Sequence, residues 1–187
     1  MNEISFTSGI KPLYLAQFRN EVSRYGKNTF IDYPWTYMES VKAINAYTDR
    51  LSDCTMLAIT DGQNVFMVHL DPENSINQSL YYLKHYISSK IDIKNKALNA
   101  ILIGSKPTKK SQNLYEMLKN ILNEFRITFS ELKNCDMPLN VAYSSSKDTY
   151  FVSGLKIDML LRKGLNTKNT ILKAFDYVKI SDLDEII

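Results

Sequence analysis

The feature that most constrains the fold is a pair of short apolar segments joined by a dipeptide that favours tight turns. Residues Cys54–Thr60 read CTMLAIT and residues Gln63–Leu70 read QNVFMVHL, with Asp61 and Gly62 between them. Asp-Gly suits both left-handed positions of a type I′ turn, so this stretch predicts a β-hairpin. Because both faces of each segment are largely apolar, the hairpin is expected inside a sheet that is covered on both sides.

Segments with helical or strand character flank the hairpin. Residues 1–35 are expected to form an irregular arm, with a helix at Leu13–Tyr25 inside it. Further helices are expected at Thr36–Tyr47, Ser75–Lys90, Ser111–Phe125 and Asn166–Tyr177, and strands at Ala97–Ile103, Ile127–Leu132, Leu139–Ser144, Thr149–Ser153 and Leu155–Leu161. The predicted fold class is α/β, with a central mixed or antiparallel, sandwich-like sheet flanked by helices. One domain over residues 1–187 is expected, with its core at about 36–153.

Charge and cysteine content narrow the function classes. The 187-residue chain has a net charge of +3, which is too small to indicate a nucleic-acid partner. Two cysteines, Cys54 and Cys135, do not make a disulfide framework and fit a reducing compartment. No apolar run is long enough to span a membrane, and the N-terminus lacks the pattern of a cleaved signal. We therefore expect a soluble protein, either cytosolic or exported by a route that reads no cleaved signal, with no membrane partner.

The predicted hairpin brings a thiol and an imidazole together. If the two turn residues are the whole loop, Cys54 faces His69 directly across the ladder, on the same side of the sheet. Side chains in such pairs have Cβ atoms about 4.5–5.5 Å apart. The imidazole could then take the thiol proton, and the thiolate could attack a carbonyl carbon. A buried cysteine that packs as a small apolar side chain, beside a structural histidine, is the alternative interpretation.

The residues around Cys54 also resemble a known superfamily. Residues 48–54 read TDRLSDC, with His69 following on the next predicted strand. This arrangement resembles the cysteine-dependent bacterial glutamine deamidases, which include the catalytic domain of cytotoxic necrotizing factor, the Burkholderia lethal factor and the chemoreceptor deamidase CheD. Those proteins carry a Leu-Ser-Gly-Cys or Leu-Gly-Ser-Cys motif on a strand, and some place a threonine six positions before the cysteine. The predicted elements of residues 48–153 also follow an order similar to that of CheD.

The resemblance implies a role for each residue of the motif. Cys54 would be the nucleophile, His69 the base and Thr48 the accessory hydroxyl that orients the imidazole. The residues that would bind the substrate or the oxyanion flank the cysteine: Ser52, Asp53 and Thr55. No cofactor or metal is implied. The substrate would be a protein that carries a target glutamine. The toxin members imply a bacterial effector that is secreted into a host cytosol and acts on a host protein, whereas the resemblance to CheD leaves open a housekeeping target in the bacterial cytoplasm.

Two alternatives stay open. A cysteine peptidase or a transglutaminase-like acyltransferase would use the same acyl-enzyme with a different acceptor. Asp53 stands where the family motif has glycine, and a carboxylate there disfavours the thiolate, so a protein-binding module with weakened activity is the other alternative. His85 is expected on a helix surface, and Cys135 lies in a predicted loop without the ligand spacing of a zinc site.

Overall fold

The computed structural model describes residues 9–24, 28–31, 40–61, 63–73, 76–95, 98–104, 108–133 and 138–175. Two five-stranded sheets dominate these residues. Sheet A has the strand order β1 (Ile10–Pro12), β10 (Thr149–Ser153), β9 (Leu139–Ser144), β4 (Asn45–Leu51) and β2 (Asn28–Ile31). Sheet B has the order β3 (Ser40–Ala43), β6 (Val65–Leu70), β5 (Thr55–Thr60), β7 (Asn99–Gly104) and β8 (Thr128–Lys133).

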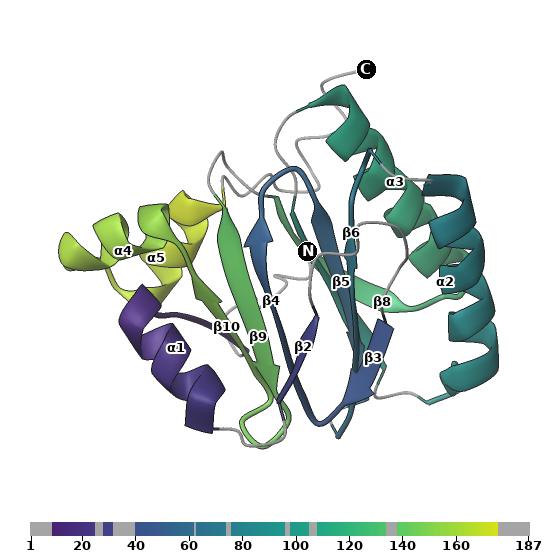
Figure 1. Ribbon diagram of the computed structural model, residues 1–187, viewed down its shortest axis with the longest axis horizontal. Helices are drawn as coiled ribbons and strands as arrows, with labels where there is room; N and C mark the ends of the chain where they lie inside the picture. The colour runs from purple at the N-terminus through teal and green to yellow at the C-terminus, as the bar shows by residue number, and fades with distance from the viewer. Residues whose placement is uncertain are drawn as a thin grey trace, which may run out of the picture.

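Both sheets are mixed, and they pack face to face as a sandwich. The β1–β10, β2–β4 and β7–β8 pairs are parallel, whereas the remaining neighbours are antiparallel. Helices cover the outer faces of the sheets (Figure 1). The α/β class predicted from the sequence is therefore confirmed, and the central sheet is a pair of sheets.

Helices α2 (Ile76–Lys90) and α3 (Lys109–Glu124) cover the outer face of sheet B (Figure 1). Their apolar residues recur at helical spacing, and Leu83, Leu114 and Leu118 are buried against that face. Side chains alternate along a strand, so Leu57 and Ile59 of β5 point toward these helices while Met56 and Ala58 point into the core between the sheets. All six residues of β5 are buried, which confirms the prediction of a hairpin covered on both sides.

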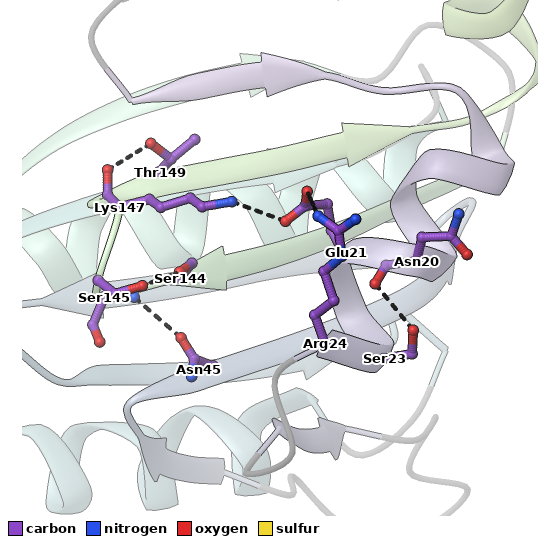
Figure 2. Close-up of polar contacts among 10 residues, drawn as sticks. Asn20, Glu21, Ser23, Arg24, Asn45, Ser144, Ser145, Lys147 and Thr149 are labelled. Carbon is purple, nitrogen blue, oxygen red and sulfur yellow. Dashed lines mark hydrogen bonds and ion pairs between the residues drawn. The ribbon is translucent and has the colours of Figure 1, made fainter.

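Helix α1 (Leu15–Arg24) packs on the outer face of sheet A, where Phe18 is buried against Ala142 and Phe151. Lys147, on the turn between β9 and β10, donates a hydrogen bond of 2.9 Å to the Glu21 carboxylate of α1 (Figure 2). This bond holds the pKa of Glu21 below its ordinary value. The polar contact and the apolar one together fix the helix on the sheet.

Helices α4 (Leu155–Arg162) and α5 (Thr167–Ala174) lie beside β1 and β10 and close one side of the core between the sheets (Figure 1). The prediction of a strand at Leu155–Leu161 is wrong. The buried Ile157 and the partly buried Leu160 and Leu161 recur at helical spacing and pack on the core, while Leu155 and Met159 are exposed. None of the helices in the described ranges is both long enough and apolar enough to cross a bilayer.

The helix predicted at Thr36–Tyr47 is also wrong where the structure describes it, because residues 40–43 belong to β3 and residues 45–47 to β4. Pairing with β9 and β2 on either side of β4 overrides the weak helical pattern of this segment. The N-terminal arm is less irregular than predicted, since β1 and β2 are strands of sheet A. The other predicted helices correspond to α1, α2, α3 and α5, and the remaining strands lie within about two residues of their predicted positions.

Candidate functional site

The turn between β5 and β6 sets where His69 lies relative to Cys54, and it is longer than predicted. Thr60 pairs with Val65, so the loop comprises the four residues 61–64. The Asp61 carboxylate accepts hydrogen bonds from the main-chain N–H groups of Gln63 at 2.9 Å and Asn64 at 2.7 Å. An aspartate that bonds its own downstream main chain in this way closes a turn without the type I′ geometry.

The longer loop moves the register of β6, and the predicted facing of Cys54 and His69 is wrong. His69 pairs with Met56, and Cys54 lies two residues before Met56, just outside the start of β5. A shift of two positions keeps the side chain on the same face, unlike a shift of one. Cys54 lies in the core between the sheets, together with Met56 and Met67. Met67 is two residues before His69 on β6, so the side chains of Met67 and His69 point to the same face of the sheet. Cys54 and His69 are therefore diagonal neighbours on one face, a relation with Cα atoms about 7–8 Å apart.

A hydrogen bond across the sandwich holds the imidazole. The Thr48 hydroxyl of β4, in sheet A, lies 2.8 Å from Nδ1 of His69 of β6, in sheet B. Both side chains are fully buried. A buried bond of this kind fixes the orientation of the ring. Because the bond uses Nδ1, Nε2 is the nitrogen through which a proton could be exchanged. The structure thus brings Thr48 to His69, the relation that the resemblance implies.

An irregularity in β4 lies next to Thr48. The pairing of β4 with β9 breaks between Thr48 and Leu51, and Arg50 within this break has a φ of 55°. The Arg50 main-chain N–H donates to the Asn140 side chain at 3.3 Å, which stabilises this uncommon conformation. Bulges of this kind bend a strand and re-aim its side chains. The irregular stretch comes directly before the segment that leads from β4 in sheet A to β5 in sheet B.

Cys54 carries a reduced thiol and is 5% exposed. The two residues before it are half-buried, and the Ser52 hydroxyl donates to the Asp53 carboxylate at 3.3 Å. On the other side of the loop, the buried Ser111 hydroxyl of α3 donates to the main-chain carbonyl of Asp53 at 2.7 Å. The position of the cysteine is therefore set by the loop, by β5 and by the first turn of α3.

Gly104 is required for the close approach of β7 to this loop. A Cβ at Gly104 would lie 2.6 Å from the Cys54 carbonyl oxygen and 2.7 Å from the Thr55 Cα. Both are main-chain atoms, which no side-chain rotation can move, so any larger residue here would force the main chain of the ladder apart. The sequence alone carries no sign that links Gly104 or Ser111 to Cys54, because these contacts join segments far apart in the chain.

Thr55 differs from the other predicted site residues. Strand alternation directs its side chain to the face of sheet B opposite Cys54, on the side of α3. Its hydroxyl is fully buried, and within the described residues it has no hydrogen-bond partner. The structure therefore brings Thr48, Cys54 and His69 to one region, places Ser52 and Asp53 at its edge, and separates the Thr55 side chain from it by the sheet.

A cavity of about 210 Å³ opens between the sheets near the opposite end of β5. Its lining includes Thr60, Asp148 and the buried Tyr150, and it contains neither cysteine nor histidine. The length of β5 separates it from Cys54, which is about 20 Å at the rise of a strand. This cavity therefore contributes nothing to a thiol–imidazole site.

No metal centre is present among the residues that the structure describes, since none of their His, Cys, Asp and Glu side chains form a group of three suited to an ion. His85 is exposed on α2, as predicted, and Cys135 lies outside the described residues. No model of a known protein family and no curated protein sequence matches this chain.

Proposed function

We propose that the protein is a cysteine amidohydrolase and, most specifically, a protein-glutamine deamidase. The observation that carries the proposal is the buried 2.8 Å contact between Thr48 and His69, on the sheet face that also carries Cys54. A thiol, an imidazole and a group that orients the imidazole are the parts of a nucleophilic site. The order threonine, cysteine, histidine is the one expected from the resemblance to the bacterial glutamine deamidases.

The reaction would proceed through a thioester. The Cys54 thiol transfers its proton to Nε2 of His69, and the sulfur attacks the side-chain amide carbon of a glutamine. The tetrahedral intermediate collapses when the imidazolium protonates the departing nitrogen, which releases ammonia. His69 then takes a proton from water, and the hydroxide attacks the thioester carbon. The C–S bond breaks, the Cys54 sulfur recovers its proton from the imidazolium, and the substrate side chain is released as glutamate. The charge on oxygen would be held by main-chain N–H groups beside Cys54.

Thr48 would select the tautomer that this mechanism needs. His69 can act as a base at Nε2 only if its neutral ring carries the proton on Nδ1. In that tautomer Nδ1–H donates to the Thr48 hydroxyl oxygen, over the 2.8 Å that separates the two atoms. In a serine protease triad, a charged aspartate accepts this bond and stabilises the imidazolium. The neutral Thr48 hydroxyl would orient the ring in the same way but would add little electrostatic stabilisation.

The burial of the pair limits how a substrate could reach it. Cys54 is 5% exposed and His69 is fully buried, whereas Ser52 and Asp53 are half-buried. A glutamine side chain is narrow and ends in a planar amide, so it suits an approach past the residues at 52–53 better than a main-chain peptide bond does. This geometry favours side-chain deamidation over peptide-bond cleavage. A host protein as target, with the chain as a bacterial effector, is the form of the proposal that the resemblance to the toxin deamidases suggests.

The test is peptide mapping of candidate protein substrates after incubation with the wild type, Cys54→Ser and His69→Ala. We expect conversion of glutamine to glutamate, with release of ammonia, from the wild type alone. Equal conversion by the wild type and Cys54→Ser would exclude the covalent mechanism. Added primary amine separates the hydrolase from a transglutaminase-like transferase, because only the transferase would couple the amine to the substrate.

The burial of Cys54 and His69, together with Asp53 beside the thiol, supports a second candidate. In this alternative the protein binds a partner and hydrolyses nothing, because a carboxylate near a buried thiol opposes formation of the thiolate. Iodoacetamide labelling of the native protein at neutral pH distinguishes the two. Labelling of Cys54 that is as slow as that of an ordinary buried thiol would favour the binding module.

A further inference from the structure

A buried hydroxyl on α3 holds the main chain next to the proposed nucleophile. Ser111 is fully buried, and its Oγ donates to the Asp53 carbonyl oxygen at 2.7 Å. The Thr108 hydroxyl, which caps α3, donates to the same Ser111 oxygen at 2.9 Å. The two hydroxyls form a series of two hydrogen bonds that ends on the carbonyl of Asp53, in the peptide immediately before Cys54. These bonds attach the first turn of α3 to the loop that carries the cysteine.

This bond determines which way the Asp53–Cys54 peptide faces. In a planar trans peptide the C=O and N–H bonds point in opposite directions. The carbonyl points toward α3, so the amide end of the peptide points away from α3. Helix α3 packs on the outer face of sheet B, whereas Cys54 belongs to the core on the other face. The positive end of this peptide dipole is therefore directed toward the side of the sheet that carries Cys54 and His69.

We propose that Ser111 is a positioning residue for the nucleophile, which keeps the amide end of the Asp53–Cys54 peptide directed toward the thiol side of sheet B. This inference rests on the proposed role of Cys54. An amide dipole directed in this way favours negative charge on the sulfur and on the oxyanion of the intermediate. It would also offset part of the unfavourable charge of the Asp53 carboxylate, which is the residue that departs from the family motif.

The experiment measures the pH dependence of Cys54 alkylation by iodoacetamide, followed by mass mapping of the peptide that contains Cys54. In Ser111→Ala the carbonyl loses its donor, and we expect the midpoint to rise by about half a pH unit, a roughly threefold loss of rate below the midpoint. Ser111→Thr, which keeps the hydroxyl, should restore the wild-type profile. Ser88→Ala is the matched control, because the exposed Ser88 of α2 also donates to a main-chain carbonyl, that of His85, at 2.9 Å.

Thr108→Ala provides a milder variant should Ser111→Ala fail to fold. Thr108 is exposed, and its removal leaves Ser111 in place without its donor, so the midpoint should rise by less than in Ser111→Ala. A midpoint that stays at the wild-type value in the folded Ser111 and Thr108 variants would overturn the inference. Ser111 would then only stabilise the packing of α3 against the loop.

The two proposals can fail separately. Alkylation requires no turnover, so a shifted midpoint in Ser111→Ala, with no amide hydrolysis by the wild type, would remove the deamidase and keep the positioning role. If the wild type is active, we expect Ser111→Ala to lower kcat about tenfold with KM near that of the wild type. Unchanged kcat would contradict the inference and leave the deamidase proposal intact.

Discussion

The bond between Thr48 and His69 gives the sharpest prediction about this protein. Thr48→Val replaces a hydroxyl by a methyl group of similar size and so removes one partner of a fully buried contact of 2.8 Å. The strands that carry the two residues belong to different sheets, so the substitution also removes a polar link across the sandwich. No change in the sheet registers is expected, because neither main chain is altered.

The magnitude follows from the burial of both groups. A buried polar atom that loses its partner costs about 1–3 kcal/mol, and we expect Thr48→Val to lower the free energy of unfolding by about 2 kcal/mol. For a chain of this size that corresponds to a fall in Tm of roughly 4–8 °C. If the protein is the proposed deamidase, Thr48→Val should also lower kcat by about a hundredfold, because the base is no longer held in its orientation.

The assay is a double-mutant cycle of Thr48→Val and His69→Leu, measured by urea unfolding. Replacing both partners removes both polar groups of this contact, so the double variant should be less destabilised than the sum of the single variants, by about 1–2 kcal/mol. The control is Thr149→Val, which removes a less buried strand hydroxyl that donates to the Lys147 carbonyl at 2.7 Å. It should cost less than about 1 kcal/mol. Additive effects of the two buried substitutions would refute the coupling between Thr48 and His69, and with it the orienting role.

Three further predictions concern backbone packing and titration. Gly104→Ala should destabilise the fold by about 3 kcal/mol in urea unfolding, because its Cβ would meet the Cys54 carbonyl oxygen at 2.6 Å; an unchanged midpoint would show that the ladder yields easily. Glu21→Gln should cost less than about 1 kcal/mol at neutral pH, because the ion pairs of Glu21 with Lys147 at 2.9 Å and with Arg24 at 3.3 Å involve exposed cations. That difference should shrink as the pH falls below the ordinary value of 4.5 through the lower folded pKa, and a difference that persists in acid would contradict the ion pair. Burial raises the pKa of Tyr143 from 10.0 to about 12, so stability should fall as the pH rises between these values, and less steeply in Tyr143→Phe; equal slopes in alkaline unfolding curves would exclude this cause.

Local patterns in the sequence predict much of the architecture. Residues 55–60 and 65–70 are apolar on both faces, and a strand of that kind must be covered on both sides. The apolar spacing of α2 and α3 predicts helices that pack on one stripe. The segment Leu155–Leu161 has the same spacing but is short, and strand and helix are hard to distinguish in a run of that length. At β4 the helical pattern was overridden by pairing partners that no local signal reveals.

The residues of the proposed site could be predicted from the sequence, but their geometry could not. Its residue types and their order, Thr48, Cys54 and His69, are visible in the sequence, and so is the tendency of residues 61–64 to turn. The turn's length was decided by the Asp61 side chain, which accepts two main-chain hydrogen bonds and moves the ladder by two positions. Because side chains alternate along a strand, that shift preserved the face while it changed the neighbour.

By itself the sequence determined the covered hairpin, the amphipathic helices and the presence of a thiol at the start of the hairpin and an imidazole near its end. Only the tertiary structure decided that Thr48 meets His69 across two sheets and that Ser111 holds the Asp53 carbonyl. The physical reason is the range of the interactions. Burial patterns and turns arise from residues a few positions apart, whereas these two hydrogen bonds join residues 21 and 58 positions apart, which become neighbours only when the layers pack.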